Sequence, residues 1–147
     1  MQCSSLMKTE VECCGRDENV ESVAERMRRR NIGFLPVCDT SGMIVGTVTD
    51  RDLTVRVLGE HRPTRDTEVG QVMSDHPVYC SADDGLDVAE ALMADHRKAR
   101  IVCVDERKHP VGVISLSDLA LVEDSAVVSS LLGAIASREA PQTQLFG

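Results

Sequence analysis

Hydrophobic residues in the first half of the chain form three runs of strand length. These runs occupy 10–14, 34–38 and 43–48. They are short and apolar, as half-buried or buried strands are. The last two are separated by Asp39-Thr40-Ser41-Gly42, a sequence typical of a turn. The first half is therefore predicted to contain a single short strand followed, further along, by a β-hairpin.

Two further segments of this half have apolar residues at helical spacing. The first helix is expected to begin after Asp17 or Asn19 and to end near 31–33, where Gly33 is a typical stop. The second is expected over 50–58. The residues predicted to face inward are Val20, Val23, Ala24 and Met27 in the first helix and Leu53, Val57 and Leu58 in the second.

The second half of the chain repeats this order of patterns. When the sequence is shifted so that Met7 falls on Met73, residues 7–58 align with 73–124 without a gap. Two copies of one supersecondary unit explain this agreement. The second copy predicts strands over 77–80, 100–104 and 111–115, a helix that begins at Asp83 or Asp84 and buries Leu86, Ala89, Leu92 and Met93, and a helix from 117 to 122.

The remaining segments connect and follow the two copies. A polar stretch around Pro63 predicts a linker. After the second copy, the apolar residues between Val127 and Ile135 predict a helix whose stripe needs a partner surface. The expected organisation is a first repeat over 3–60, a linker over 61–68, a second repeat over 69–124, a C-terminal helix over 125–139 and a tail over 140–147.

Composition narrows the classes of function. The 147 residues are enough for one compact domain or two small half-domains. A net charge of -8 disfavours binding to nucleic acid or to an anionic membrane, and 2% aromatic residues leave few rings for stacking bases. No apolar run is long enough to span a bilayer, and the first ten residues do not resemble an export signal. We therefore expect a cytoplasmic protein.

The six cysteines are expected to be reduced thiols, and they include no C-x-x-C pair. Cys38, Cys80 and Cys103 lie in or beside apolar runs, where cysteine packs as a small hydrophobe. The cysteines able to join a metal or redox site are Cys3, Cys13 and Cys14, although Cys13 and Cys14 would point to opposite faces of a strand. The four histidines have no metal-ligand spacing, so no metal site is predicted.

Several motifs indicate a family. Gly33-Phe34-Leu35-Pro36-Val37 resembles a Gly-x-Leu-Pro-Val segment, and 42–53 (GMIVGTVTDRDL) resembles a strand that runs into a Thr-x-Arg-Asp-Leu helix start. The stretch 111–119 (VGVISLSDL) is a second copy, and Met7-Lys8-Thr9 and Val72-Met73-Ser74 match the beginnings of the two units. On these residues the chain, over about 3–124, resembles a pair of cystathionine β-synthase (CBS) domains, or Bateman module.

The resemblance implies a fold and a function. The expected fold is α/β, with two repeats of order β-α-β-β-α packed about a pseudo-twofold axis, plus a C-terminal helix. Clefts between such repeats bind AMP, ADP, ATP or S-adenosylmethionine, and two pairs often form a homodimer. The chain is thus expected to be a non-enzymatic regulatory module, without a required cofactor, that signals an adenosine ligand to an unidentified partner protein.

The resemblance also places the ligand site at the start of the helix that follows each hairpin. An aspartate there can accept hydrogen bonds from both ribose hydroxyls, and free helix N–H groups suit a phosphate. The adenine would lie against apolar residues of the first hairpin strand. The candidate residues are Asp52 for the ribose, Thr49 and Arg51 for the phosphate, Ile32, Phe34 and Pro36 for the adenine, and Ser115 and Asp118 in the second repeat.

Two observations indicate that the candidate ligand sites of the two repeats are not equivalent. Thr49-x-x-Asp52 and Ser115-x-x-Asp118 also fit helix capping boxes, which need no ligand. The second repeat has Ala99, Val102 and Ser117 in place of Gly33, Pro36 and Arg51. Its phosphate contact would then need Arg97, Lys98 or Arg100. The first repeat is therefore the preferred site.

Two other functions remain open. One is a ligand-free dimeric scaffold that uses the stripe from Val127 to Ile135, with Leu131 and Leu132 as the residues to test. The other is a thiol or metal sensor built from Cys3, Cys13 and Cys14.

Overall fold

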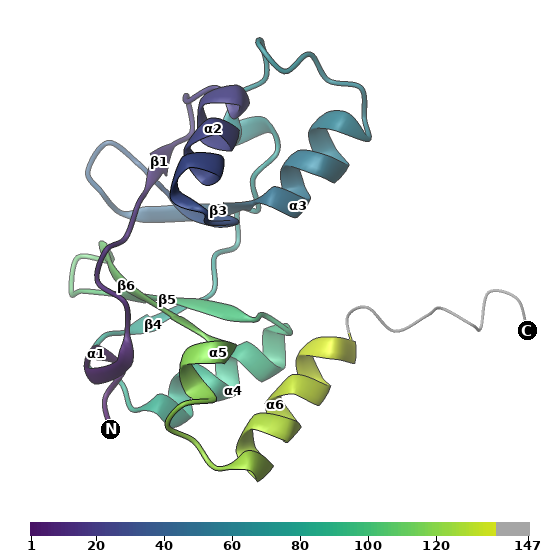
Figure 1. The fold of residues 1–147 in the computed structure, drawn as a ribbon. Coiled ribbons are helices and arrows are strands. Elements are labelled where there is room, and N and C mark those ends of the chain that lie inside the picture. The colour runs from purple at the N-terminus through teal and green to yellow at the C-terminus, as the bar shows by residue number, and fades with distance from the viewer. Residues whose placement is uncertain (138–147) are drawn as a thin grey trace, which may run out of the picture. The chain divides into compact units, whose positions relative to one another are not determined.

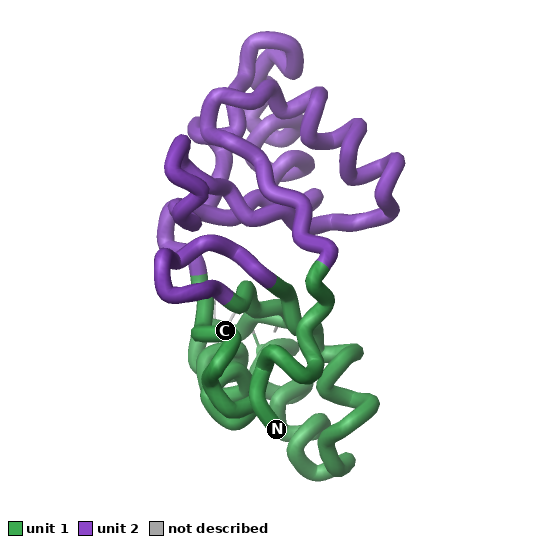
Figure 2. Tube along the Cα trace, turned by 90° about the vertical axis from the view of Figure 1, so that its left-hand side faces the viewer, with its two compact units in different colours: residues 1–9, 78–103, 112–147 green, residues 10–77, 104–111 purple. Residues whose placement is uncertain are grey.

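The computed structural model describes residues 1–137, which form two compact units. Among the described residues, unit 1 combines Met1–Thr9 and Val78–Cys103 with 112–137, and unit 2 combines Glu10–Pro77 with Val104–Val111. Figure 2 shows unit 1 in green and unit 2 in purple. Each unit contains most of one repeat together with the short segment that precedes the other repeat. We call these segments leaders: residues 1–9 in unit 1 and 69–77 in unit 2.

The first repeat forms a three-stranded sheet in the order β1-β2-β3 (Figure 1). β1 is parallel to β2, and β2 is antiparallel to β3, as the hairpin prediction requires. Two helical segments follow β3, and a short 3-10 turn forms in the leader. The elements are β1 (Cys14–Gly15), α2 (Val20–Arg30), β2 (Phe34–Cys38), β3 (Ile44–Thr49), α3 (Asp50–Asp52), η1 (Leu53–Leu58) and η2 (Val69–Gln71).

Helix α2 packs on the sheet through a narrow apolar face. Val23 and Met27 are buried in a cluster with the strand residues Leu35, Val37 and Val48. Ala24 is exposed, contrary to prediction, because consecutive helical residues point about 100° apart and Val23 already faces the sheet.

Helix α2 is capped by an asparagine at each end, Asn19 and Asn31. Asn19 accepts a hydrogen bond from the Glu21 amide at its start, as one of the two predicted caps. The helix ends at Asn31, which is left-handed with φ 52°, rather than at Gly33. Asparagine tolerates this conformation, so the helix ends within the predicted range 31–33, with asparagine rather than glycine as its stop.

The second helix of the repeat is one α-turn, α3, continued by the π-helical η1. Its Val57 is buried beside Val20 and Val72. Leu58 is 64% exposed, so its predicted inward orientation is wrong. It follows Val57 directly and therefore points away from that cluster.

The second repeat forms the sheet β4-β5-β6, with helices packed on it (Figure 1). α4 is capped by Gly85 rather than by Asp83 or Asp84. The predicted inward residues Leu86, Ala89 and Met93 are buried. The elements of this half are β4 (Tyr79–Ser81), α4 (Leu86–His96), β5 (Arg100–Val104), β6 (Pro110–Ser115), α5 (Leu116–Leu119) and α6 (Ser125–Ala136), with α1 (Cys3–Leu6) in the leader.

Helix α6 covers the core of unit 1. Leu131 and Ile135 are buried in the same cluster as Met93 and Ile101. The predicted apolar stripe therefore has its partner surface within this chain, on α4. Leu132 points outward and is 52% exposed. The last two residues of the expected C-terminal helix, 138–139, and the expected tail lie outside the described residues.

The two leaders are held by matching hydrogen bonds. The Val69 amide donates to the Glu18 carbonyl in unit 2, and the Cys3 amide donates to the Asp84 carbonyl in unit 1. These pairs coincide under the same shift that aligns the repeats. The leaders also pair at equivalent bridges, Thr47 with Ser74 and Lys8 with Val113. The internal repeat in the sequence is thus repeated in the backbone of each unit.

Within residues 1–137, no helix has the length and apolar content needed to cross a membrane.

Candidate functional site

The preferred ligand residues lie at a tight turn where β3 passes into α3. Asp52 accepts a hydrogen bond from the Thr49 amide at 2.9 Å, and the Asp52 amide donates to Thr49 Oγ1 at 3.1 Å. This reciprocal pair is a capping box, as the spacing predicted. Asp52 Oδ2 makes the backbone contact, whereas the one partner of Oδ1 among residues 1–137 is Arg56 Nε at 3.9 Å. The second carboxylate oxygen therefore retains hydrogen-bonding capacity.

The sheet places an aromatic residue beside this turn. Phe34 on β2 is directly opposite Thr49 on β3, and Pro36 is opposite Thr47. Directly opposed residues share one face of an antiparallel pair, so Phe34 and Thr49 are neighbours. Phe34 is half-buried, whereas Pro36 is fully buried. Ile32 packs against the cluster under α2.

The start of α3 differs from the expected anion site because its amides are already occupied. The amide of Asp50 donates to the Gly33 carbonyl, and the amide of Arg51 donates to Asp50 Oδ1. The Asp52 amide is used by Thr49, as described above. The amides of residues 50–52 thus have partners within the turn and would have to exchange them to bind a phosphate.

Asp50 adds a negative charge that the motif comparison did not single out. Its carboxylate lies so close to Gly33 that a Cβ at that position would be 2.6 Å from Asp50 Oδ2. Gly33 is therefore required for this approach. Arg51, the expected phosphate contact, is exposed next to Asp50. The sequence signal for this contact was Gly33 together with Asp50 directly after β3. That signal does not show where the Asp50 carboxylate lies.

In the corresponding turn of the second repeat, the aspartate carboxylate has more partners. The Ser115 amide donates to Asp118 Oδ2 at 2.9 Å, and the Ser115 hydroxyl donates to the same oxygen at 2.8 Å. Lys8 Nζ lies 3.4 Å from Asp118 Oδ1. Burial alone would raise the pKa of Asp118, but Ser115 and Lys8 outweigh it and hold that pKa below its usual value. Both oxygens of Asp118 therefore have partners.

The second repeat also lacks an aromatic neighbour. Its counterpart of Phe34 is Arg100, which is exposed at the beginning of β5. The Leu116 amide donates to the Ala99 carbonyl, as Asp50 does to Gly33. Leucine replaces the aspartate, so the close carboxylate is missing and Ala99 is accommodated. The two turns share a backbone and differ in chemistry.

The family model for the CBS domain matches residues 3–59 and 69–124. The chain belongs to the CBS domain family. It is 35% identical over 121 residues to the uncharacterized protein YlbB of Bacillus subtilis, an alignment that covers 82% of this chain and 80% of that protein. The two matched segments agree with the internal repeat, and each contains one of the capping turns.

Solved structures show the same fold. Hypoxic Response Protein I, solved with two coordinated zinc ions, has a TM-score of 0.75 at 24% identity, covering 84% of this chain and 100% of that one. Hypoxic response protein 1 of Mycobacterium tuberculosis is a sequence relative, 27% identical over 115 residues that cover 78% of this chain and 80% of that protein. The CBS domain pair of protein MJ0100, solved with 5'-methylthioadenosine and S-adenosyl-L-methionine, has a TM-score of 0.73 at 18% identity, covering 83% and 94%.

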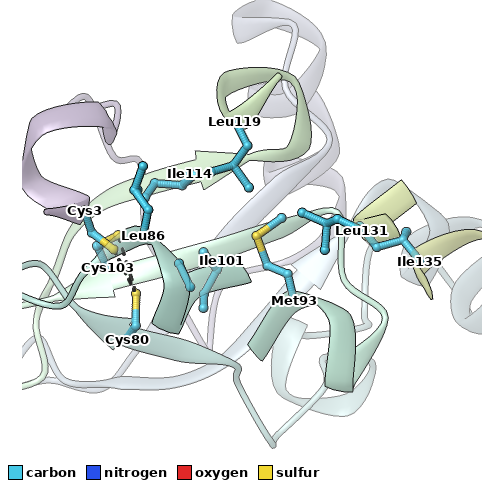
Figure 3. Close-up of a cluster of buried hydrophobic side chains, with 11 residues drawn as sticks. Cys3, Cys80, Leu86, Met93, Ile101, Cys103, Ile114, Leu119, Leu131 and Ile135 are labelled. Atoms are coloured by element: carbon cyan, nitrogen blue, oxygen red, sulfur yellow. Dashed lines mark hydrogen bonds between the residues drawn. The ribbon is translucent and has the colours of Figure 1, made fainter. Parts of the chain in front are cut away.

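A second cluster of chemically reactive side chains lies inside unit 1. Cys3 Sγ is 3.8 Å from Cys80 Sγ, which is 3.9 Å from Cys103 Sγ (Figure 3). Burial, together with the adjacent Cys80, raises the pKa of Cys3 to about 12, and the contact with Cys103 followed by burial raises the pKa of Cys80. Cys3 and Cys80 are therefore protonated thiols at neutral pH without a further positive charge.

The candidate trio of Cys3, Cys13 and Cys14 is divided between the two units. Cys14 is buried in the core of unit 2, where its thiol donates to the Pro36 carbonyl, and Cys13 contacts Cys38. Cys3 belongs to unit 1 because its leader joins the second repeat. The sequence signal that could have found the cluster is the repeat alignment. It matches Cys3 with Val69, a residue of the other leader.

Proposed function

We propose that this CBS pair is a regulatory module that senses an adenosine derivative at the Thr49–Asp52 turn of the first repeat. The observation that carries the proposal is the incompletely occupied carboxylate of Asp52, which is 14% exposed beside the half-buried ring of Phe34. A carboxylate oxygen can accept a ribose hydroxyl, and a ring face can stack on adenine. In the second repeat, Arg100 stands in the place of Phe34, and both oxygens of Asp118 have partners.

The charges at the turn favour a ligand without several phosphates. Asp50 and Asp52 are balanced by Arg51 and Arg56 in formal charge, and the first helical amides are occupied. A polyphosphate would therefore meet nearby carboxylates without free amides to bind it. S-adenosylmethionine or 5'-methylthioadenosine, both present in the MJ0100 structure, are the preferred ligands over AMP, ADP and ATP.

The module is proposed to signal rather than to catalyse. A ligand that binds one conformation more tightly than another shifts the equilibrium by that difference in affinity. The receiving protein would read the shifted conformation. We propose a cytoplasmic homodimer acting on a separate regulated protein, without an enzymatic step.

Thermal unfolding with a panel of adenosine compounds tests the ligand. At about 100 times its dissociation constant, a ligand adds roughly 2.7 kcal/mol and raises Tm by several degrees. Asp52→Asn keeps an oxygen for the Thr49 amide but replaces the carboxylate, so the ligand-dependent shift should disappear while the cap remains. Asp118→Asn is the matched control and should retain the shift. A shift lost only in Asp118→Asn would move the site to the second repeat.

A second candidate function is a ligand-free interaction module. Its support is the exposure of Val55 and Leu58 on η1, and of Leu121 and Leu132 near the end of unit 1. Large exposed apolar residues favour an interface. Leu58→Glu and Leu132→Glu, compared by analytical ultracentrifugation, should each dissociate a dimer that uses its helix. Leu131 is unsuitable for this test because it is buried in the unit 1 core.

A dimer that persists in both leucine variants would contradict the interaction module. A thermal shift that persists in Asp52→Asn would contradict the ligand site at Asp52. A protein that shows no shift with any adenosine compound and still unfolds cooperatively would leave the interaction module as the supported function.

A further inference from the structure

Three cysteines from distant parts of the sequence converge in the core of unit 1. Cys3 begins the leader helix α1, Cys80 lies on β4 and Cys103 lies on β5 (Figure 3). Their three sulfur atoms all lie within 4.8 Å of one another. Cys3 and Cys103 are fully buried, and Cys80 is 4% exposed. The convergence depends on the leader, because only the leader brings Cys3 to the second repeat.

The matching positions of unit 2 show what the fold itself requires there. Under the repeat alignment, Cys3 corresponds to Val69, Cys80 to Cys14 and Cys103 to Val37. All three counterparts are buried in a single cluster of unit 2. Valine thus fills two of these three core positions in an equivalent backbone. Packing alone does not require the sulfur atoms of Cys3 and Cys103.

We propose that Cys3, Cys80 and Cys103 form a binding site for a thiophilic divalent ion of the zinc group, Zn²⁺ or Cd²⁺. A Zn–S bond of about 2.3 Å places the sulfur atoms of a tetrahedral site about 3.8 Å apart, and those of a planar three-coordinate site about 4.0 Å apart. The Cys3–Cys80 and Cys80–Cys103 distances of 3.8 and 3.9 Å already match. The third pair, within 4.8 Å, needs an adjustment of about 1 Å or less to reach the tetrahedral spacing.

A backbone oxygen stands where a fourth ligand could approach. The Gly85 carbonyl oxygen lies 3.6 Å from Cys3 Sγ. With Zn–S near 2.3 Å and Zn–O near 2.1 Å, the S···O edge of a tetrahedron is also about 3.6 Å. Sulfur ligands select soft ions over Mg²⁺ or Ca²⁺, which prefer oxygen.

Charge favours a divalent ion over a monovalent one. Binding converts three thiols to thiolates and releases three protons to solvent, so a divalent ion leaves one net negative charge and Cu⁺ leaves two. Most surrounding side chains, including Leu86, Met93 and Ile101, are apolar, and the nearby Asp84 raises the pKa of Cys3 and Cys80 further. A smaller net charge costs less in such surroundings. The ion itself supplies the positive charge that stabilises the thiolates.

The leader provides the route to the buried sulfurs. It is attached to the second repeat through the Cys3 amide to Asp84, the Ser4 amide to Ala82 and the Leu86 amide to Met1. Local opening of these few backbone bonds exposes Cys3 without unfolding the sheet. A bound ion would link Cys3 to β4 and β5 and would oppose this opening.

Metal binding by the untagged full chain tests the proposal. The reduced, metal-free protein is dialysed against Zn²⁺, and Co²⁺ is used as a probe because thiolate ligation produces sulfur-to-cobalt charge-transfer absorption. We expect one ion for each chain. Cys3→Val and Cys103→Val introduce the valines that unit 2 has at these positions, and each should weaken binding at least 100-fold. Cys13→Ser and Cys38→Ser should retain the ion.

Hydrogen exchange of the wild-type chain provides a measurement that needs no variant. Saturating Zn²⁺ should slow exchange of the Cys3 and Ser4 amides at least tenfold. The proposal is overturned if the wild-type chain binds no ion, if Cys3→Val and Cys103→Val bind as tightly as wild type, or if Zn²⁺ leaves the exchange of these amides unchanged.

Discussion

The two CBS repeats of this chain share a backbone and differ in a few side chains that decide their chemistry. At three matched core positions, unit 2 has Cys14, Val37 and Val69, whereas unit 1 has three cysteines. The leader bonds that position these residues are equivalent in the two units. The comparison shows that the repeated fold constrains burial at these positions, but not the choice between an inert core and a cluster of sulfur ligands.

The capping turns show the same divergence in a polar setting. Both turns have a reciprocal capping box. Lys8 occupies Asp118, whereas its counterpart beside the first repeat is Ser74, which cannot supply a cation. The cation at Asp118 Oδ1 is thus Lys8 at 3.4 Å, whereas the cation at Asp52 Oδ1 is Arg56 at the longer distance of 3.9 Å. Retention of a motif in both repeats does not imply two equal ligand sites.

The largest expected effect comes from transferring the cysteine cluster to unit 2. In Val37→Cys/Val69→Cys, the two new thiols join Cys14 in the buried cluster. We expect the double variant to bind one more Zn²⁺ for each chain than wild type, as measured by equilibrium dialysis. A cooperatively unfolding double variant without additional zinc would show that matching backbone positions do not suffice for the site.

Each leader passes close to a glycine of a strand, Gly46 in unit 2 and Gly112 in unit 1. Substitution of these two glycines by alanine should destabilise the protein unequally. A Cβ at Gly46 would be 2.6 Å from the Ser74 carbonyl oxygen, whereas one at Gly112 would meet the Met7 side chain, at 2.3 Å from Sδ and 2.8 Å from Cβ. The backbone at Ser74 can move aside less easily than the flexible side chain of Met7. We expect Gly46→Ala to lower the free energy of unfolding by about 2–3 kcal/mol and Gly112→Ala by about 1 kcal/mol, as measured by urea denaturation. Equal losses would contradict this difference between the units.

Unit 1 should also carry a pH dependence that unit 2 lacks. Burial, followed by the nearby Glu123, raises the pKa of Glu90 from 4.5 to about 7. Because the native pKa lies above the unfolded one, the stabilisation is complete below about pH 4.5 and is lost as pH rises through about 7. Solvent screening reduces the effect, so Glu90→Gln should gain about 1 kcal/mol over wild type at pH 8.

The matched position in unit 2 supplies the control for this titration. Glu90 corresponds to the exposed Ala24, and Glu123 corresponds to the buried Val57. Ala24→Gln should leave the pH dependence of urea denaturation unchanged. An unchanged pH profile in Glu90→Gln would show that this carboxyl group does not produce it.

The smallest expected effect concerns ligand choice at the first repeat. Asp50→Asn removes one of the two carboxylates at the turn. We expect AMP binding to strengthen up to about fivefold and 5'-methylthioadenosine binding to change by less than twofold, since only the former carries a phosphate. Calorimetric titration with both compounds measures the ratio. Equal changes for the two ligands would indicate that Asp50 does not face the phosphate.

Much of this fold could be predicted because local signals determine it. Strands β2 and β5 have the predicted bounds, and the Thr49 and Ser115 capping boxes follow from residue spacing. The family match then confirmed the two CBS repeats. The end of α2 lies within the predicted range 31–33, at Asn31 rather than Gly33, because left-handed asparagine can take the place of glycine.

The sequence was less informative wherever long-range contacts decide the outcome. It did not place Cys3 with Cys80, because the leader joins the other repeat. It did not reveal that Leu131 faces α4 within the same chain. At the candidate site, the occupied amides depend on the Gly33 carbonyl and on the side-chain orientation of Asp50, neither of which a motif specifies.

The central claim, a single adenosine site on the first repeat, is tested most directly by calorimetric titration of S-adenosylmethionine and 5'-methylthioadenosine into wild type, Asp52→Asn and Asp118→Asn. The account predicts one site for each chain in wild type and Asp118→Asn, and at least tenfold weaker binding in Asp52→Asn. Unchanged binding in Asp52→Asn, or two equal sites in wild type, would contradict it.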